Sequence, residues 1–289
     1  MILIGTKNGL VTSDGTALLE GDVTHVIDGE DGAWVLTTEQ ILQGEPDALR
    51  AVAPLDGIEA NCLLPSRHGL FVGAADARLY RLDGSSLQRV ESFDQVQDRD
   101  TWHTPWGGPP DVRSMTEAPD GTIYAGVHVG GIVRSRDGGE TWTPTIDIDT
   151  DIHQVITHDD LVIAPGWNAL HVSEDAGETW TEHRDGFDHT YMRAVAIAGD
   201  ALLVSAAYSH AGKDAGVYRR DLRGDGPFER IEPVHPSEHN IDTFWLAANG
   251  SQAAFVTAEG ELYRSTDRGR TWSRAARGLA LPRCLALRE

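Results

Sequence analysis

Residues 135–142 read SRDGGETW, and the same pattern returns as SEDAGETW at 173–180 and as STDRGRTW at 265–272. All three share the frame Ser-x-Asp-x-Gly-x-Thr-Trp. The interval between the second and third copies has room for two units. A degenerate copy, VYRRDLRGDGPFERI (217–231), lies in that interval. The chain is therefore predicted to be built from repeats.

One unit shows how a repeat is organised. Residues 112–146 read VRSMTEAPDGTIYAGVHVGGIVRSRDGGETWTPTI, which divides into four short strands separated by Asp-Gly and Gly-Gly turns. These turns are typical of antiparallel hairpins. No long stretch has a helical period. A repeated four-stranded unit of about 40 residues is typical of a propeller blade.

The first strands of the blades can be counted. They are DVTHV (22–26), EANCL (59–63), DVRSM (111–115), DIHQV (151–155), YMRAV (191–195), NIDTF (240–244) and LPRCL (281–285). The last one lacks three partner strands, which ILIGT, GLVTS and TALLE near the N-terminus can supply. We therefore predict an all-β fold, a seven-bladed β-propeller closed by joining its N- and C-terminal strands.

The whole chain, 1–289, is predicted to be one domain. Its expected blades are 22–57, 58–95, 111–147, 150–186, 190–233, 239–279, and 281–289 together with 1–20.

Composition narrows the classes of partner. With 45 acidic against 24 basic residues, the formal net charge of −21 argues against nucleic acid and anionic membranes. An acidic coat of this kind is typical of proteins from a salt-rich cytoplasm, where screening shortens charge repulsion. No apolar run is long enough to span a membrane, and MILIGTKNGL lacks a signal-peptide pattern, so a cytoplasmic protein is expected. Cys62 and Cys284 lie in apolar strands and are expected to be buried free thiols.

The three eight-residue strings resemble the Asp-box, or BNR repeat, of the sialidase-like β-propellers. Families with this box include sialidases, xyloglucan hydrolases and photosystem II assembly factors, so the resemblance implies a fold more than a function. A structural role is expected for the box residues Asp137, Trp142, Asp175, Trp180, Asp267 and Trp272. The aspartates would accept turn amides, the glycine permits positive φ, and the tryptophans would fill space between blades. Function is then expected on the opposite face.

On that face, the middle residues of the first strands should form a ring at the propeller axis. They are Thr24, Asn61, Arg113, His153, Arg193, Asp242 and Arg283. Two interpretations remain open. The ring is either a self-satisfied polar lining with Arg–Asp pairs around a wet channel, or a site where three arginines hold a carboxylate or phosphate. Sialidases also place three arginines around a substrate carboxylate, and this set is similar in type.

Turns and insertions should form a rim over this ring. The turns carry Lys7, Glu39, His128, Trp167, Tyr208 and His210, and the insertions 94–110 and 233–240 carry Trp106 and the string HPSEH. Asn61, His128 and His210 are candidate ligand contacts. Trp106 or Trp167 could stack on a sugar, or pack within its own loop.

We expect a small anionic or carbohydrate ligand, or a protein partner, and no catalysis. The alternative is a sialidase-like exo-glycosidase, for which the resemblance suggests Tyr208 as nucleophile, with Glu39 or Glu259 as its partner and Asp242 as acid/base. Against it, the Arg-Ile-Pro segment is absent, sialidases have six blades, and xyloglucan hydrolases need two propellers. A third alternative is an assembly-factor-like protein binder.

The sequence predicts no cofactor and no metal site. It contains no phosphate-binding Gly loop and no nucleophile elbow, and HPSEH has no helix to fix the spacing of its histidines. The sequence determines neither the identity of the ligand nor the oligomeric state.

Overall fold

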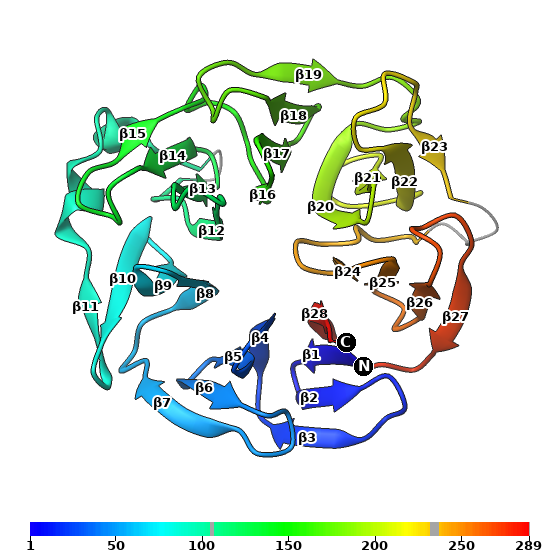
Figure 1. Cartoon of the computed structure of the whole chain (residues 1–289), viewed down its shortest axis with the longest axis horizontal. Helices are drawn as coiled ribbons and strands as arrows, with labels where there is room; N and C mark the ends of the chain where they lie inside the picture. Colours follow the sequence, from blue (N-terminus) through cyan, green and yellow to red (C-terminus); the bar gives the residue numbers. More distant parts are fainter. Residues whose placement is uncertain (105–106, 232–236, 289) are drawn as a thin grey trace.

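The computed structural model describes residues 1–104, 107–231 and 237–288. Its strands form seven four-stranded antiparallel sheets around a central axis, which confirms the predicted propeller (Figure 1). Within each sheet the chain runs outward from an inner strand at the axis to an outer strand at the circumference. We number the sheets as blades in chain order, so that blade 7 contains both termini.

The strands of blades 1 to 3 are as follows: β4 (Val23–Gly29), β5 (Gly32–Thr37), β6 (Gln40–Gly44) and β7 (Arg50–Pro54); β8 (Ala60–Ser66), β9 (Gly69–Ala74), β10 (Arg78–Asp83) and β11 (Ser86–Arg89); β12 (Val112–Glu117), β13 (Ile123–Val127), β14 (Gly131–Ser135) and β15 (Thr143–Pro144). Blades 4 and 5 contain β16 (Ile156–His158), β17 (Leu161–Pro165), β18 (Leu170–Ser173) and β19 (Thr181–His183); β20 (Tyr191–Ala198), β21 (Ala201–Ala207), β22 (Gly216–Asp221) and β23 (Glu229–Arg230). Blades 6 and 7 contain β24 (Leu246–Asn249), β25 (Gln252–Val256), β26 (Leu262–Ser265) and β27 (Ser273–Ala276); β28 (Pro282–Leu287), β1 (Ile2–Thr6), β2 (Gly9–Thr12) and β3 (Ala17–Glu20).

Burial explains the hydrophobic pattern of these strands. The second strands β13 and β17 are buried at every position, because their faces pack against the neighbouring blades. Outer strands such as β3 are at most half-buried and carry polar residues. Two short 3₁₀ helices, η1 (Glu91–Gln95) and η2 (Arg99–Thr101), precede blade 3, and Phe93 and Trp102 anchor this segment in the core. Within the described residues, no helix is long and apolar enough to cross a bilayer.

The ring closes as predicted, because the C-terminal strand completes a sheet begun by the N-terminus. Strand β28 pairs antiparallel with β1, with Ile2 opposite Leu287 and Ile4 opposite Leu285. The amino group of Met1 also donates to the carbonyl oxygen of Arg288 at 2.5 Å. Joining the termini in one blade removes two free sheet edges.

The three box turns share one hydrogen-bond network. In the first, Asp137 Oδ1 accepts from the Thr141 amide at 2.9 Å, and Oδ2 accepts from the Thr141 hydroxyl at 2.6 Å. The Ser135 hydroxyl donates to Asp137 and accepts from the Gly139 amide, whose residue has φ +95°. Equivalent bonds surround Asp175 and Asp267. The serine, aspartate and threonine side chains of each box thus have partners in their own turn.

Side chains next to the ring residues bind adjacent blades together. The residue that follows a ring position accepts the amide of the next blade's inner strand: His25 Nδ1 accepts from Leu63, and Ser114 Oγ accepts from Val155. Gln154 does the same for the amide of Val195. Both cysteines also occupy this position, and both are buried and free. The inner strands are therefore held at fixed positions around the axis.

Candidate functional site

Five of the seven ring residues are placed by β-bulges in the inner strands. In each of these blades the pairing register shifts by one residue, which leaves the ring residue as the extra one: Thr24, Asn61, Arg113, Arg193 and Arg283. A bulge bends its strand and redirects the side chain that it carries. The polar ring position therefore coincides with a β-bulge in five of the seven blades.

The other two ring residues lie outside regular strands, which corrects two predicted first strands. In blade 4, DIHQV (151–155) precedes β16, and only Ile152 forms an isolated bridge, to Gly166. In blade 6, NIDTF (240–244) precedes β24. Both segments instead make side-chain contacts with neighbouring blades, and these contacts replace the regular pairing at their positions.

A segment of blade 6 crosses the axis and closes the channel. The Thr243 hydroxyl donates to the His153 carbonyl of blade 4 at 3.0 Å, and the Phe244 ring stacks on His25 of blade 1 with centroids 3.9 Å apart. The loop before β24 reaches toward the centre in Figure 1. Phe244 has φ +66°, a conformation that is unfavourable for a bulky residue. Its side chain lines pockets at both mouths, so it separates them.

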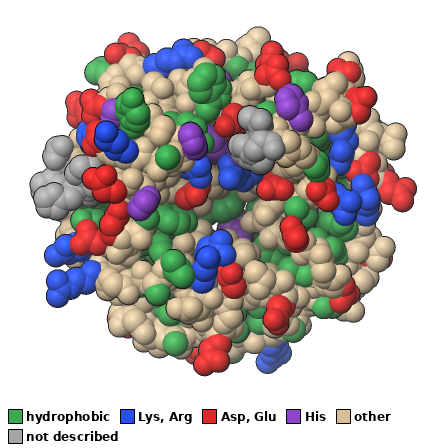
Figure 2. Space-filling model, turned by 180° about the vertical axis from the view of Figure 1, so that it is seen from behind, with side chains coloured by type: hydrophobic (Ala, Val, Ile, Leu, Met, Phe, Trp, Pro, Cys, Tyr) green, Lys and Arg blue, Asp and Glu red, His purple; other side chains and the backbone are tan. Residues whose placement is uncertain are grey.

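The pocket on the predicted face has a volume of about 450 Å³. It is lined by the ring residues Thr24, Asn61, Arg113, Asp242 and Arg283, together with residues that include Lys7, Asp111 and Phe244. Figure 2 shows Lys, Arg, Asp, Glu and His side chains gathered around the hollow at the centre of one face. We call this cavity the axial pocket.

Two of the three predicted arginines are already paired with carboxylates. Arg193 Nη1 lies 2.8 Å from both oxygens of Asp242, and Arg283 Nη2 lies 2.9 Å from Asp22 Oδ2. Burial alone would raise the pKa of Asp242, but the Arg193 guanidinium outweighs burial and holds that pKa below its usual range. Arg193 and Arg283 therefore fit the interpretation of Arg–Asp pairs rather than that of arginines that hold an anion.

Arg113 differs from these two. It has no ion pair within the part of the chain that the structure describes, and its Nη1 is buried without a hydrogen-bond partner there. Burial lowers its pKa. The amide nitrogen of Asn61 is likewise buried without a described partner. Both groups are hydrogen-bond donors in the axial pocket, and Lys7 adds a second cation at its edge.

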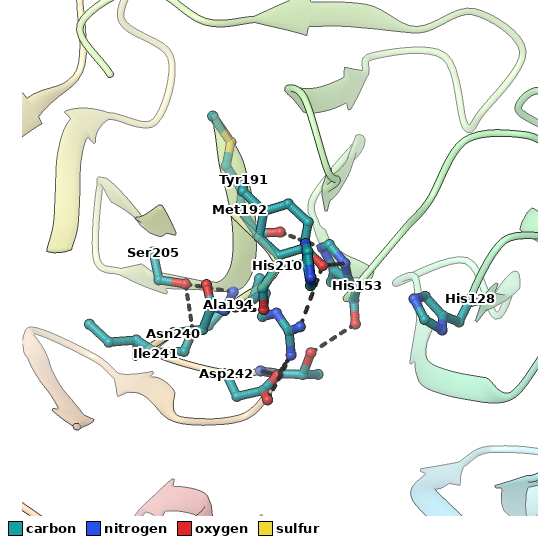
Figure 3. A network of polar contacts seen from close by, with 12 residues as sticks. His128, His153, Tyr191, Met192, Ala194, Ser205, His210, Asn240, Ile241 and Asp242 are labelled. Atoms are coloured by element: carbon teal, nitrogen blue, oxygen red, sulfur yellow. Dashed lines mark hydrogen bonds and ion pairs between the residues drawn. The ribbon is translucent and has the colours of Figure 1, made fainter. Parts of the chain in front are cut away.

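A polar network lies beside the pocket (Figure 3). His153 is fully buried; its Nδ1 lies 2.5 Å from the Met192 carbonyl oxygen and its Nε2 lies 3.1 Å from the Tyr191 hydroxyl. Arg193 Nη2 is 3.4 Å from the same hydroxyl. Sequence reasoning missed Tyr191, although it precedes Arg193 by two positions in β20 and so shares its face of the strand.

His128, another predicted contact, is buried in the turn between β13 and β14. Its Nε2 lies 2.9 Å from Asp151 Oδ1, and Asp151 Oδ2 lies 3.5 Å from His153 Nε2. Asp151 was also missed, although it stands two positions before a ring residue. The structure thus adds a second histidine and a carboxylate to the vicinity of His153.

The remaining candidates are not brought into the pocket. Trp167 and Tyr208 are exposed, by 51% and 65%, and His210 and Glu39 are also exposed. None of these four lines the axial pocket. Trp106 lies outside the described residues.

Comparison with known proteins supports the repeat and the fold. The family model "BNR/Asp-box repeat" matches residues 263–274. No curated protein matches the sequence. A GH74 xyloglucanase from Xanthomonas campestris superimposes with a TM-score of 0.61 at 16% identity, over 95% of this chain and 46% of that one.

Two further structures have similar scores. YCF48 from Cyanidioschyzon merolae superimposes with a TM-score of 0.59 at 15% identity, over 89% of this chain and 86% of that one. A chain of a nidogen/laminin complex superimposes with a TM-score of 0.59 at 10% identity, over 99% of this chain and 97% of that one. An ancestral GH74 enzyme is covered over only 40% of its length. At these identities the likeness establishes the fold alone.

Proposed function

Because this chain is a β-propeller with BNR/Asp-box repeats, a scaffold that serves many functions, we propose its function from the axial pocket: it binds a small organic anion there. The anion carries a carboxylate or phosphate that Arg113 recognises. The observation that carries this proposal is the buried Nη1 of Arg113, which has no partner among the described residues. A buried donor of this kind is costly unless a ligand or water satisfies it.

The rest of the pocket suits such a ligand. Asn61 offers a second buried donor, and Lys7 a second cation without a described ion pair. Asp111 also lines the pocket, and burial raises its pKa. The volume of about 450 Å³ lies within the usual range for small-molecule sites. Phe244 supplies an apolar surface for the non-ionic part of the ligand.

Hydrolysis has less support. Asp242 contacts Arg193 through both oxygens and has a lowered pKa, so at neutral pH it carries no proton to donate. Tyr208 and Glu39 do not line the pocket. A protein partner at this site is also less well supported, because the pocket is concave and polar rather than a flat apolar patch.

The direct test is Arg113→Met, with Arg277→Met as the matched control. Arg277 is exposed and distant from the pocket lining. Binding of citrate, glucuronate and inorganic phosphate would be measured by titration calorimetry at several salt concentrations. We expect at least one of these anions to bind the parent protein and the control, more weakly at high salt, because screening reduces the attraction in an open site.

Arg113→Met should weaken that binding at least about tenfold, the loss expected for one charge-assisted hydrogen bond. Equal affinity in Arg113→Met and Arg277→Met would reject Arg113 as the anchor. Absence of binding for all three anions would indicate a pocket filled by water and would leave the polar ring as architecture.

A further inference from the structure

A second constellation lies next to the axial pocket. His128, Asp151 and His153 each offer one ligand atom, and the three atoms lie within 4.8 Å of one another. The two shortest separations are 2.9 Å, from His128 Nε2 to Asp151 Oδ1, and 3.5 Å, from Asp151 Oδ2 to His153 Nε2. Donor atoms about 2.1 Å from a tetrahedral metal ion are separated by about 3.4 Å. The two observed separations, which involve different oxygens of Asp151, lie on either side of this value.

The tautomer of His153 is set by the fold. Its Nδ1 lies 2.5 Å from the Met192 carbonyl oxygen, which can only accept, so Nδ1 carries the proton. The lone pair of the neutral ring is then on Nε2, which lies 3.5 Å from the Asp151 carboxylate. The Tyr191 hydroxyl, 3.1 Å away, can donate a hydrogen bond to this lone pair, and a metal ion would compete with that bond. An Nδ1–H bond to a backbone carbonyl is also the usual support of a metal-binding histidine.

The two histidines and the carboxylate come from a rigid part of the fold. His128 is in the turn after β13, while Asp151 and His153 are fixed by backbone bonds, from Trp167 N to Asp151 O and from His153 N to Pro165 O. The His128 and His153 side chains are at most 8% exposed.

We propose that His128, Asp151 and His153 bind a divalent transition-metal ion such as Zn²⁺. Two imidazoles and one carboxylate suit zinc and its neighbours, whereas Mg²⁺ and Ca²⁺ prefer sites made of oxygen atoms only. Three protein ligands leave one coordination position open. The Tyr191 hydroxyl lies 3.1 Å from His153 Nε2 and must turn away from that nitrogen when the ion binds.

The surrounding charges predict what fills the open position. Arg193 and Asp242 offset each other. Asp151 interacts electrostatically with Arg113 and cannot offset both that cation and a divalent ion. The occupied site therefore has a net positive charge. An anionic fourth ligand, hydroxide or chloride, would reduce it.

The test uses the full chain after treatment with a chelator. Co²⁺ is added as a spectroscopic probe and Zn²⁺ is titrated by calorimetry, on the parent protein, His128→Ala, Asp151→Asn and the control His239→Ala, which removes an exposed histidine from the HPSEH loop. We expect one equivalent to bind the parent and the control, with the visible spectrum of four-coordinate Co²⁺. The two ligand variants should bind at least about tenfold more weakly.

Failure of the parent protein to bind one equivalent would overturn the proposal without any variant, leaving a hydrogen-bonded cluster. Unchanged affinity in folded His128→Ala, or loss of binding in His239→Ala, would place the ion elsewhere and also overturn it. Because Arg113 is not a ligand, Arg113→Met should retain the metal. The outcome is thus independent of the anion experiment.

Discussion

Arg113 and Arg193 hold equivalent positions in their blades but are in opposite states. Arg193 faces Asp242 and contacts both of its oxygens, whereas Arg113 has no carboxylate within ion-pair distance in the described parts of the chain. Each of the two lies at a register shift of its inner strand. What differs is the residue opposite, which belongs to another blade. At the residue scale, the pairing of each cation is therefore set by its neighbours rather than by its own strand.

This difference predicts opposite effects on stability. Arg193→Met leaves Asp242 without its partner, and we expect a loss of roughly 1–3 kcal/mol in unfolding free energy. This is below the range for fully buried pairs, because Asp242 keeps some contact with solvent. Arg113→Met removes a buried charge that has no described partner and should be neutral or stabilising. Urea unfolding of the two variants gives the comparison.

The double variant Arg193→Met/Asp242→Asn serves as the control. It should recover part of the stability lost in Arg193→Met, since no unpaired charge remains. If Arg193→Met had the same unfolding free energy as the parent, the Arg193–Asp242 ion pair would not contribute to stability.

At the scale of the element, the box turn is stabilised by hydrogen bonds from its own side chains. Its serine and aspartate satisfy the turn amides, and its tryptophan packs toward the preceding blade, as in the edge-to-face contact of Trp142 with Phe93 at 5.1 Å. The same bonds recur in three blades with different surroundings. A weaker relative in β2–β3 keeps only part of the pattern, where Asp14 accepts from the Thr16 amide. The box is therefore local scaffold, and the axial pocket lies away from it.

The box aspartates should make stability depend on pH in acid. Hydrogen bonds from the Thr141 hydroxyl and nearby groups lower the pKa of Asp137 from 3.8 to about 2. A carboxylate whose pKa is depressed on folding adds stability above its unfolded pKa and loses it as the pH falls toward the folded value. We expect Asp137→Asn to be less stable than the parent at pH 5, and the difference to shrink between about pH 4 and pH 2.

Melting temperatures across this range provide the measurement, and the exposed Asp31→Asn is the control for loss of one negative charge. A constant difference between Asp137→Asn and the parent at every pH would contradict the linkage.

At the scale of the whole molecule, ring closure depends on one sheet formed by both ends of the chain. Strand β28 pairs with β1 and its side chains join the core between blades 6 and 7 and between blades 7 and 1. Figure 1 shows the two termini side by side in this blade. Without β28, the inner strand of blade 7 is missing and the axial pocket loses Arg283.

Deleting residues 281–289 should therefore abolish cooperative folding or lower the melting temperature strongly, as judged by circular dichroism. A circular permutant that joins the present ends through a short linker, with new ends in the exposed turn at Asp56–Gly57, should fold like the parent. A stable, monomeric deletion variant would show that the closing strand is dispensable.

The sequence by itself determined the blade count, the closing sheet and the axial positions. Strand patterns, turn residues and box spacing are local properties, so they can be read without knowing what lies opposite. The polar residue in each apolar inner strand marked the ring, including Arg113 and Asp242 in the pocket.

Only the tertiary structure decided how these residues are used. The bulges, the plug formed by Phe244, the pairing of Arg283 with Asp22 and the meeting of His128 with Asp151 each join different elements or blades. Their side-chain geometry depends on the rotation between neighbouring sheets, which no local pattern encodes. For that reason the sequence left open whether the three arginines pair with carboxylates. In the fold Arg193 and Arg283 are paired, and Arg113 has no carboxylate partner in the part of the chain that the structure describes.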